Sequence, residues 1–122
     1  MVEPSLEDLA FQQQFEEAQS AATQANLTEP RAVSAYYDST VGLVIIRLQS
    51  GAIFSFPPEI AQGLAGAEPD VLAQVEVTPM GDGLHWETLD ADFSVAGLLA
   101  GVFGTKRWMA DLQQRWLQQQ AS

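Results

Sequence analysis

The pattern of apolar positions near the N-terminus is helical. From Phe11 to Ala25 the apolar residues recur at spacings of four, three, four and three, which is the period of an amphipathic helix. The stripe that we predict consists of Leu6, Leu9, Phe11, Phe15, Ala18, Ala22 and Ala25. An isolated amphipathic helix of this length is marginal in water. We therefore expect residues 1–28 to form an acidic helix that packs against another surface.

The middle of the chain alternates between apolar and polar residues in short runs. Residues 31–38, 43–49 and 52–56 are separated by Gly-containing turns and predict three strands of an antiparallel meander. One face of the second run is apolar throughout: Val44, Ile46 and Leu48. Short helices are expected at residues 59–65 and 69–73, and short strands at residues 74–78 and 84–87.

The last quarter of the chain predicts two helices. Asp92 or Ser94 is a candidate N-cap for an apolar helix that reaches Val102. A final helix begins after Thr105 and carries an apolar face: Trp108, Met109, Leu112, Trp116 and Leu117. Residues 118–120 are read as a polar tail beyond that helix. The sequence thus predicts an α+β fold, in which a small antiparallel sheet is covered by helices. The expected units are the helix of residues 1–28 and a compact domain of residues 29–122.

Charge and composition exclude several classes of protein. The chain of 122 residues has 16 acidic and five basic residues, a formal net charge of -11 and no cysteine. Residues 51–100 contain eight acidic residues and no basic one, which argues against direct binding to nucleic acid. The apolar runs are shorter than the ~20 residues that a membrane span needs, and no N-terminal signal is visible. We expect a cytoplasmic protein that does not bind a membrane.

The candidate chemistry is concentrated after residue 84. His85 is the only histidine, and Glu87, Asp90 and Asp92 follow it closely. Such a group can perform acid–base chemistry or bind a cation, but no second ligand has the spacing of a zinc site. We therefore expect His85 to be hydrogen-bonded, Trp86 to be buried, and Asp90, Asp92 and Ser94 to cap turns and the following helix. No catalytic residue, metal site or cofactor is predicted.

Two segments carry a resemblance to a known family. FPPEIAQGLAGA at residues 56–67 and GLHWETLDADFSVAGLLAG at residues 83–101 resemble a family of small bacterial proteins that contain a domain of unknown function. The similarity covers residues 31–109, and the run from Trp86 to Val95 is its most specific part. It implies a compact α+β domain with a small antiparallel sheet. Some members look like partners in toxin–antitoxin pairs, and others carry a helix-turn-helix domain; no catalytic residue follows from the resemblance.

Three hypotheses about function remain open at this point. The first is a non-enzymatic, antitoxin-like or regulatory protein that binds a protein partner or a second copy of itself. Its candidate contact residues are Leu9, Phe11, Phe15, Trp108 and Trp116. The second is a small metal- or ligand-dependent enzyme built on His85 and the nearby carboxylates. The third is an acidic mimic of DNA.

Overall fold

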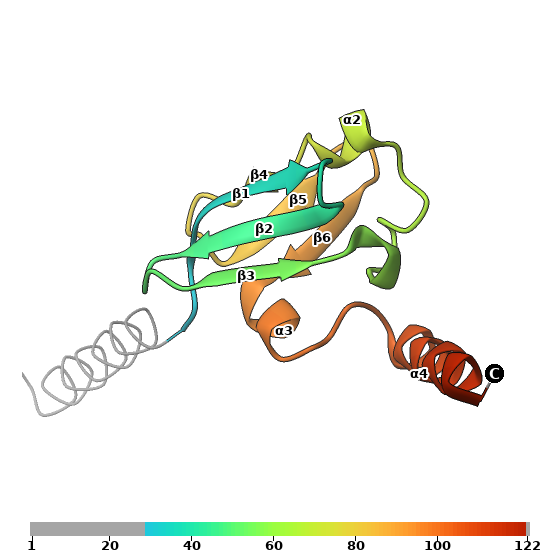
Figure 1. Ribbon diagram of the computed structural model, residues 1–122. Helices are drawn as coiled ribbons and strands as arrows, with labels where there is room; N and C mark the ends of the chain where they lie inside the picture. Colours follow the sequence, from blue (N-terminus) through green and yellow to red (C-terminus); the bar gives the residue numbers. More distant parts are fainter. Residues whose placement is uncertain (1–28, 122) are drawn as a thin grey trace, which may run out of the picture.

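The computed structural model describes residues 29–121 (Figure 1). The predicted helix of residues 1–28, with Leu9, Phe11 and Phe15, lies outside the described residues. Two antiparallel sheets of three strands each, together with helices, confirm the α+β class. The first sheet has the order β1-β2-β3, and the second has the order β4-β5-β6.

The first sheet is the predicted meander. It consists of β1 (Ala32–Asp38), β2 (Leu43–Leu48) and β3 (Ile53–Phe56), each paired antiparallel with the next strand. Val44 and Ile46 are fully buried and Arg47 is exposed, as the alternation predicts. The side chains of this inner face form one layer of the core.

The sequence predicts two short strands, at residues 74–78 and 84–87. The structure has three strands in this region, and they form a second sheet. Its members are β4 (Glu76–Val77), β5 (Gly83–Trp86) and β6 (Ala91–Ser94). Strand β6 was not predicted, because Asp92 and Ser94 read as helix caps in the sequence. In the structure Ala91 and Asp92 pair with Trp86 and His85 of β5, and Ala91 is buried while Asp92 is exposed. The period at these residues is therefore that of a strand.

Two of the three short helices end earlier than predicted. The first, η1 (Pro58–Ile60), is a single 3-10 turn rather than a helix to residue 65, and Gly63 and Gly66 beyond it have positive φ. The second, α2 (Pro69–Leu72), agrees with prediction. The third, α3 (Val95–Leu99), ends before Val102, with Gly101 at a φ of 84°.

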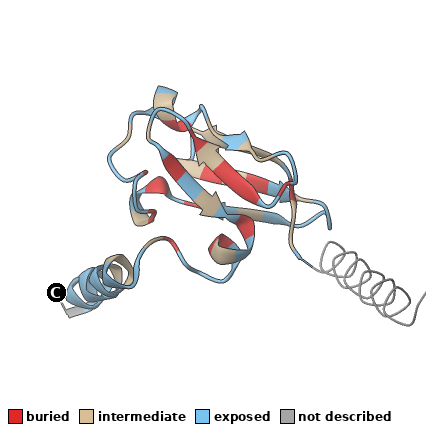
Figure 2. Ribbon diagram, turned by 180° about the vertical axis from the view of Figure 1, so that it is seen from behind, coloured by how far each residue is buried: buried red, intermediate tan, exposed pale blue. Residues whose placement is uncertain are grey.

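The last helix, α4 (Lys106–Ala121), is longer than predicted, because residues 118–120 continue it instead of forming a polar tail. Glutamine is a good helix former, so a run of three prolongs the helix. Most of α4 is exposed, whereas the buried residues lie on the strands, on the short helices and in loops, among them Ala61 and Leu64 after η1 and Phe103 before α4 (Figure 2).

Trp86 lies fully buried in the core that both sheets share, and its predicted burial is confirmed. Its indole N–H donates a hydrogen bond of 3.0 Å to the Leu72 carbonyl oxygen at the end of α2. Its ring meets the ring of Phe93 edge-on, with centroids 5.9 Å apart and planes at 88°. The same side chain therefore contacts both β6 and α2.

Replacing Trp86 by alanine should lower the free energy of unfolding by about 3–5 kcal/mol, since a large side chain leaves a cavity in a closed core. Urea denaturation followed by circular dichroism measures this change. Val41→Ala is the matched control, because Val41 is 57% exposed and should shift stability by less than about 0.5 kcal/mol. Equal midpoints for the two variants would contradict the central position of Trp86.

Candidate functional site

The strand hairpin β5–β6 brings His85 and two of the predicted carboxylates together. His85 and Asp92 are direct cross-strand partners, and the His85 Nδ1 atom lies 2.6 Å from Asp92 Oδ1. The other ring nitrogen, Nε2, lies 2.7 Å from Glu87 Oε2. Glu76 of β4 pairs with His85 in the sheet register from the opposite side. A single imidazole thus lies on an acidic, outward-facing strip of the second sheet.

The two hydrogen bonds decide the protonation state of His85. The hydrogen bond to Glu87 is the largest cause, and the one to Asp92 the next, of a pKa raised from 6.5 to about 9. Partial desolvation opposes the shift but does not cancel it. At neutral pH the ring is therefore a cation whose two N–H groups both donate to carboxylates. A ring in this state has no lone pair with which to act as a general base or a metal ligand.

Asp90 does not join this cluster. It occupies the turn between β5 and β6, where it has a φ of 47° and its backbone N–H donates to the Glu87 carbonyl oxygen over 3.1 Å. Aspartate tolerates this left-handed conformation better than most residues, which accounts for its place in the turn. Asp90 therefore shapes the hairpin, whereas the two ring nitrogens of His85 pair with Asp92 and Glu87.

Ser94 is the N-cap of α3. Its Oγ accepts a hydrogen bond of 2.9 Å from the backbone N–H of Gly97. The alternative expectation that Asp92 caps this helix is wrong, since its carboxylate pairs with His85 on the strand before the helix. A Cβ atom at Gly97 would lie 2.6 Å from Ser94 Oγ, so the cap also requires glycine at that position.

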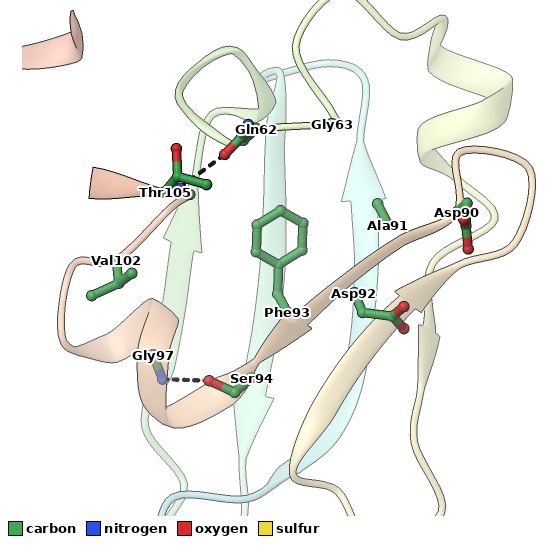
Figure 3. Close-up of a pocket in the computed structure, with 11 residues that line it drawn as sticks. Gln62, Gly63, Asp90, Ala91, Asp92, Phe93, Ser94, Gly97, Val102 and Thr105 are labelled. Atoms are coloured by element: carbon green, nitrogen blue, oxygen red, sulfur yellow. Dashed lines mark hydrogen bonds between the residues drawn. The ribbon is translucent and has the colours of Figure 1, made fainter. Parts of the chain in front are cut away.

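A pocket of about 490 Å³ opens beside β6 (Figure 3). Phe93 and Ser94 of β6 line it, together with Gln62 and Thr105 from loops that the sequence did not point to. Polar groups in its wall form hydrogen bonds with each other: Gln62 Oε1 accepts one of 2.9 Å from the Thr105 backbone N–H. Within residues 29–121, no three His, Asp or Glu side chains are grouped so that they could hold a metal ion.

A second and more apolar cavity, of about 600 Å³, runs between α4 and the body of the domain. Its wall on the body consists of Glu59, Ile60, Gly101 and Phe103. Its wall on the helix carries Met109, Leu112, Arg115 and Trp116, with two glutamines. We call this cavity the α4 groove. Met109, Leu112 and Trp116 belong to the predicted apolar face, and Phe103 lies just before α4, but Ile60 comes from a segment that only the folded chain brings near.

The two tryptophans of α4 have different surroundings. Trp108 is half-buried, and its indole N–H donates a hydrogen bond of 2.8 Å to the Ile60 carbonyl oxygen. The Arg115 guanidinium lies 5.7 Å from the centroid of the Trp108 ring, within range of a cation–π contact. Trp116 is 57% exposed at the groove, and Leu117 beside it is 53% exposed. Trp108 thus anchors α4, while Trp116 faces solvent.

Comparison with known sequences places the chain in a family. Residues 32–104 match the family described as protein of unknown function (DUF2442). The chain belongs to the DUF2442 family. A comparison with curated proteins returns no match. The family segment holds both sheets, the His85 cluster and α3, and it ends just before α4.

Two solved structures resemble this DUF2442 protein. The crystal structure of a protein of unknown function from Rhodospirillum rubrum is 56% identical, with a TM-score of 0.65. It covers 67% of this chain and 99% of its own. The solution NMR structure of an uncharacterized protein from Chromobacterium violaceum is 31% identical with the same TM-score, and it covers 91% of this chain and 95% of its own. In the part of the chain that the structure describes, no helix is long and apolar enough to cross a bilayer.

The His85 ring should titrate near pH 9, because both carboxylates favour its charged form. The folded pKa lies above the ordinary value of 6.5, so this stabilisation is fully present below pH 6.5 while the carboxylates stay ionised. It should be lost as pH rises from 6.5 to about 9. The difference in free energy of unfolding between wild type and His85→Gln should shrink over that interval. An NMR titration of the single histidine measures the pKa directly, and a value near 6.5 would contradict the paired geometry.

Removing the N-cap of α3 should lower the stability of the protein moderately. Ser94→Ala leaves the Gly97 N–H without its acceptor and should lower the free energy of unfolding by about 1 kcal/mol. Ser55→Ala is a suitable control, because Ser55 is exposed on β3 and caps no helix. Chemical denaturation of both variants at pH 7 measures the difference. Equal stabilities of Ser94→Ala and Ser55→Ala would contradict the capping role of Ser94.

Proposed function

We propose that this DUF2442 protein is a non-enzymatic binding module that regulates another protein chain in the manner of an antitoxin, and that it binds through the α4 groove. The observation that carries the proposal is the exposure of large apolar side chains along α4. Trp116 and Leu117 are neighbours on the helix, and each is more than half exposed. Tryptophan is enriched among the residues that contribute most to protein interfaces.

The way α4 is attached also favours a binding role. Hydrogen bonds at the start of α4 attach it to the body through Thr105, Trp108 and Met109. The following turns project beyond the sheets (Figure 1). A helix that serves only the core would bury its apolar face along most of its length. A helix that leaves an apolar groove open is suited to receive a segment of a second chain.

The state of the candidate catalytic groups favours binding over catalysis. His85 is a cation with both N–H groups engaged, so it is a poor general base at neutral pH. The Ser94 hydroxyl oxygen caps α3, and the two ring nitrogens of His85 pair with Asp92 and Glu87. The positions of these side chains are explained by their structural roles in the hairpin and at the start of α3.

Affinity purification from the cells that make the protein, followed by binding measurements with each purified candidate, tests the proposal. The wild-type chain should bind at least one protein directly. Trp116→Lys should weaken that binding about thirtyfold, which corresponds to about 2 kcal/mol for the loss of a central contact. The fold of the variant should be unchanged, because Trp116 is 57% exposed.

Val41→Lys is the matched control for this experiment. Val41 is also 57% exposed, but it lies in the turn between β1 and β2 and does not line the α4 groove. It should bind as wild type does. Equal affinities for wild type, Trp116→Lys and Val41→Lys would show that the α4 groove is not the contact surface.

A further inference from the structure

We infer that the α4 groove receives the N-terminal segment, residues 1–28, of a second copy of the same chain. The inference rests on the proposed function, because it names the occupant of the groove through which the protein binds. Two copies that exchange these segments would make the same contact twice, which is the usual arrangement of a symmetric homodimer.

Charge complementarity is the first argument. Helix α4 holds three of the five basic residues of the chain, Lys106, Arg107 and Arg115, and a single acidic residue, Asp111. Residues 1–28 contain five acidic residues and no basic one. Arg115 and Glu59 both line the groove, Arg115 on the wall that α4 forms, so the positive charge that an acidic segment would meet lies on α4. Opposite charges of this kind favour the pairing of the two segments and its register.

Apolar pattern and length agree with that pairing. The sequence of residues 6–25 predicts a helix with Phe11 and Phe15 on its apolar stripe, and such a helix is about 30 Å long. Helix α4 has 16 residues and is therefore about 24 Å long. The two lengths suit packing side by side. Phe11 and Phe15 would bring large apolar side chains to Trp116 and Leu117, each of which is more than half exposed.

Both segments lie outside the family domain. The DUF2442 match spans residues 32–104, so it includes neither residues 1–28 nor α4. The Rhodospirillum rubrum protein corresponds over almost its whole length to two thirds of this chain. The central domain therefore exists elsewhere with much less chain around it. The two additional segments carry opposite net charge, and the Chromobacterium violaceum structure, which covers 91% of this chain, extends into them.

The position of the chain near residue 29 favours a second copy over the same copy. The start of β1 is fixed to the second sheet: the Ala32 N–H donates to the Gly81 carbonyl oxygen over 2.7 Å, and Arg31 Nη1 donates to the Met80 carbonyl oxygen over 3.0 Å. Figures 1 and 2 show that this start and α4 lie at opposite ends of the molecule. The five residues 26–30 can span at most about 17 Å. The start of β1 thus lies far from the groove of the same copy, which favours the groove of a second copy as the contact.

A pairing of α4 with α4 of a second copy is disfavoured by the same charges. Each α4 has three basic residues against one acidic residue, so two of them repel when they lie side by side. The acidic segment of residues 1–28 complements both the apolar face and the positive charge of α4, whereas a second α4 complements only its apolar face.

Sedimentation velocity of the full-length chain tests the inference. The protein concentration should run from about 1 to 200 µM, which covers dissociation constants in the micromolar range. The wild-type chain should form a dimer in this range. Glu16→Lys combined with Glu17→Lys should weaken dimerisation about tenfold or more, and so should Arg115→Glu. Arg47→Glu is the control for the second change, since Arg47 is exposed on β2 and outside the groove; it should dimerise as wild type does.

Mixing the two weakened variants supplies the decisive observation. In the mixed dimer a lysine-bearing segment faces a glutamate-bearing α4, and a native acidic segment faces a native α4, so opposite charges meet in both contacts. A one-to-one mixture of the Glu16→Lys/Glu17→Lys and Arg115→Glu proteins should therefore form dimers within about threefold of the wild-type affinity. Circular dichroism of each variant checks that its fold is intact.

The outcomes separate the inference from the proposed function. A chain that stays monomeric at 200 µM overturns the inference, as does a dimer that both charge reversals leave unchanged, which would indicate α4 pairing or another surface. If a different protein still binds in a manner sensitive to Trp116→Lys, the proposed function stands without the inference. If neither a second copy nor another protein binds through the groove, both are wrong.

Discussion

The burial of the Trp86 indole is the constraint on which the domain depends. The ring is too large for either short sheet alone, so both sheets contribute side chains to the core around it. Its N–H must also find an acceptor, because an unpaired donor in the core is costly. The Leu72 carbonyl oxygen provides one, and this ties α2 to the second sheet. The edge-on contact with Phe93 fixes the position of β6 at the same point. A single side chain thus joins strand, hairpin and helix.

This constraint also determines where His85 lies. Leu84 and Trp86 are both fully buried, so the alternation of a strand turns His85 between them toward the outer face of the second sheet. The register of the hairpin places Asp92 directly opposite it, and Glu87 follows at the end of the strand. The histidine becomes a cation that donates hydrogen bonds to two carboxylates on the outer face of the hairpin. The reactive-looking residues of the sequence are explained by the packing beneath them.

The sequence predicts the first sheet well because its period-two pattern is long and regular. It misses β6 because Asp92 and Ser94 resemble helix caps, and only the pairing with β5 reveals a four-residue strand. It overextends η1 and α3 because backbone turns at Gly63 and Gly101 depend on tertiary packing. The sequence shows that carboxylates lie close to His85 along the chain. Which of them pairs with its ring depends on the register between β5 and β6. The α4 groove is only partly predictable from the sequence, since Ile60 approaches α4 from a distant part of the chain, whereas Phe103 directly precedes the helix.

These observations lead to a division of the molecule into a closed domain and segments that bind. Hydrogen exchange of the full-length chain, followed by mass spectrometry at low and high protein concentration, tests this division most directly. Amides of β2 and β5 should exchange slowly and equally at both concentrations, because the core is complete within one copy. Amides of residues 112–120 should exchange quickly in dilute protein and become protected as the concentration rises. Protection of residues 112–120 that does not change with concentration would contradict the account.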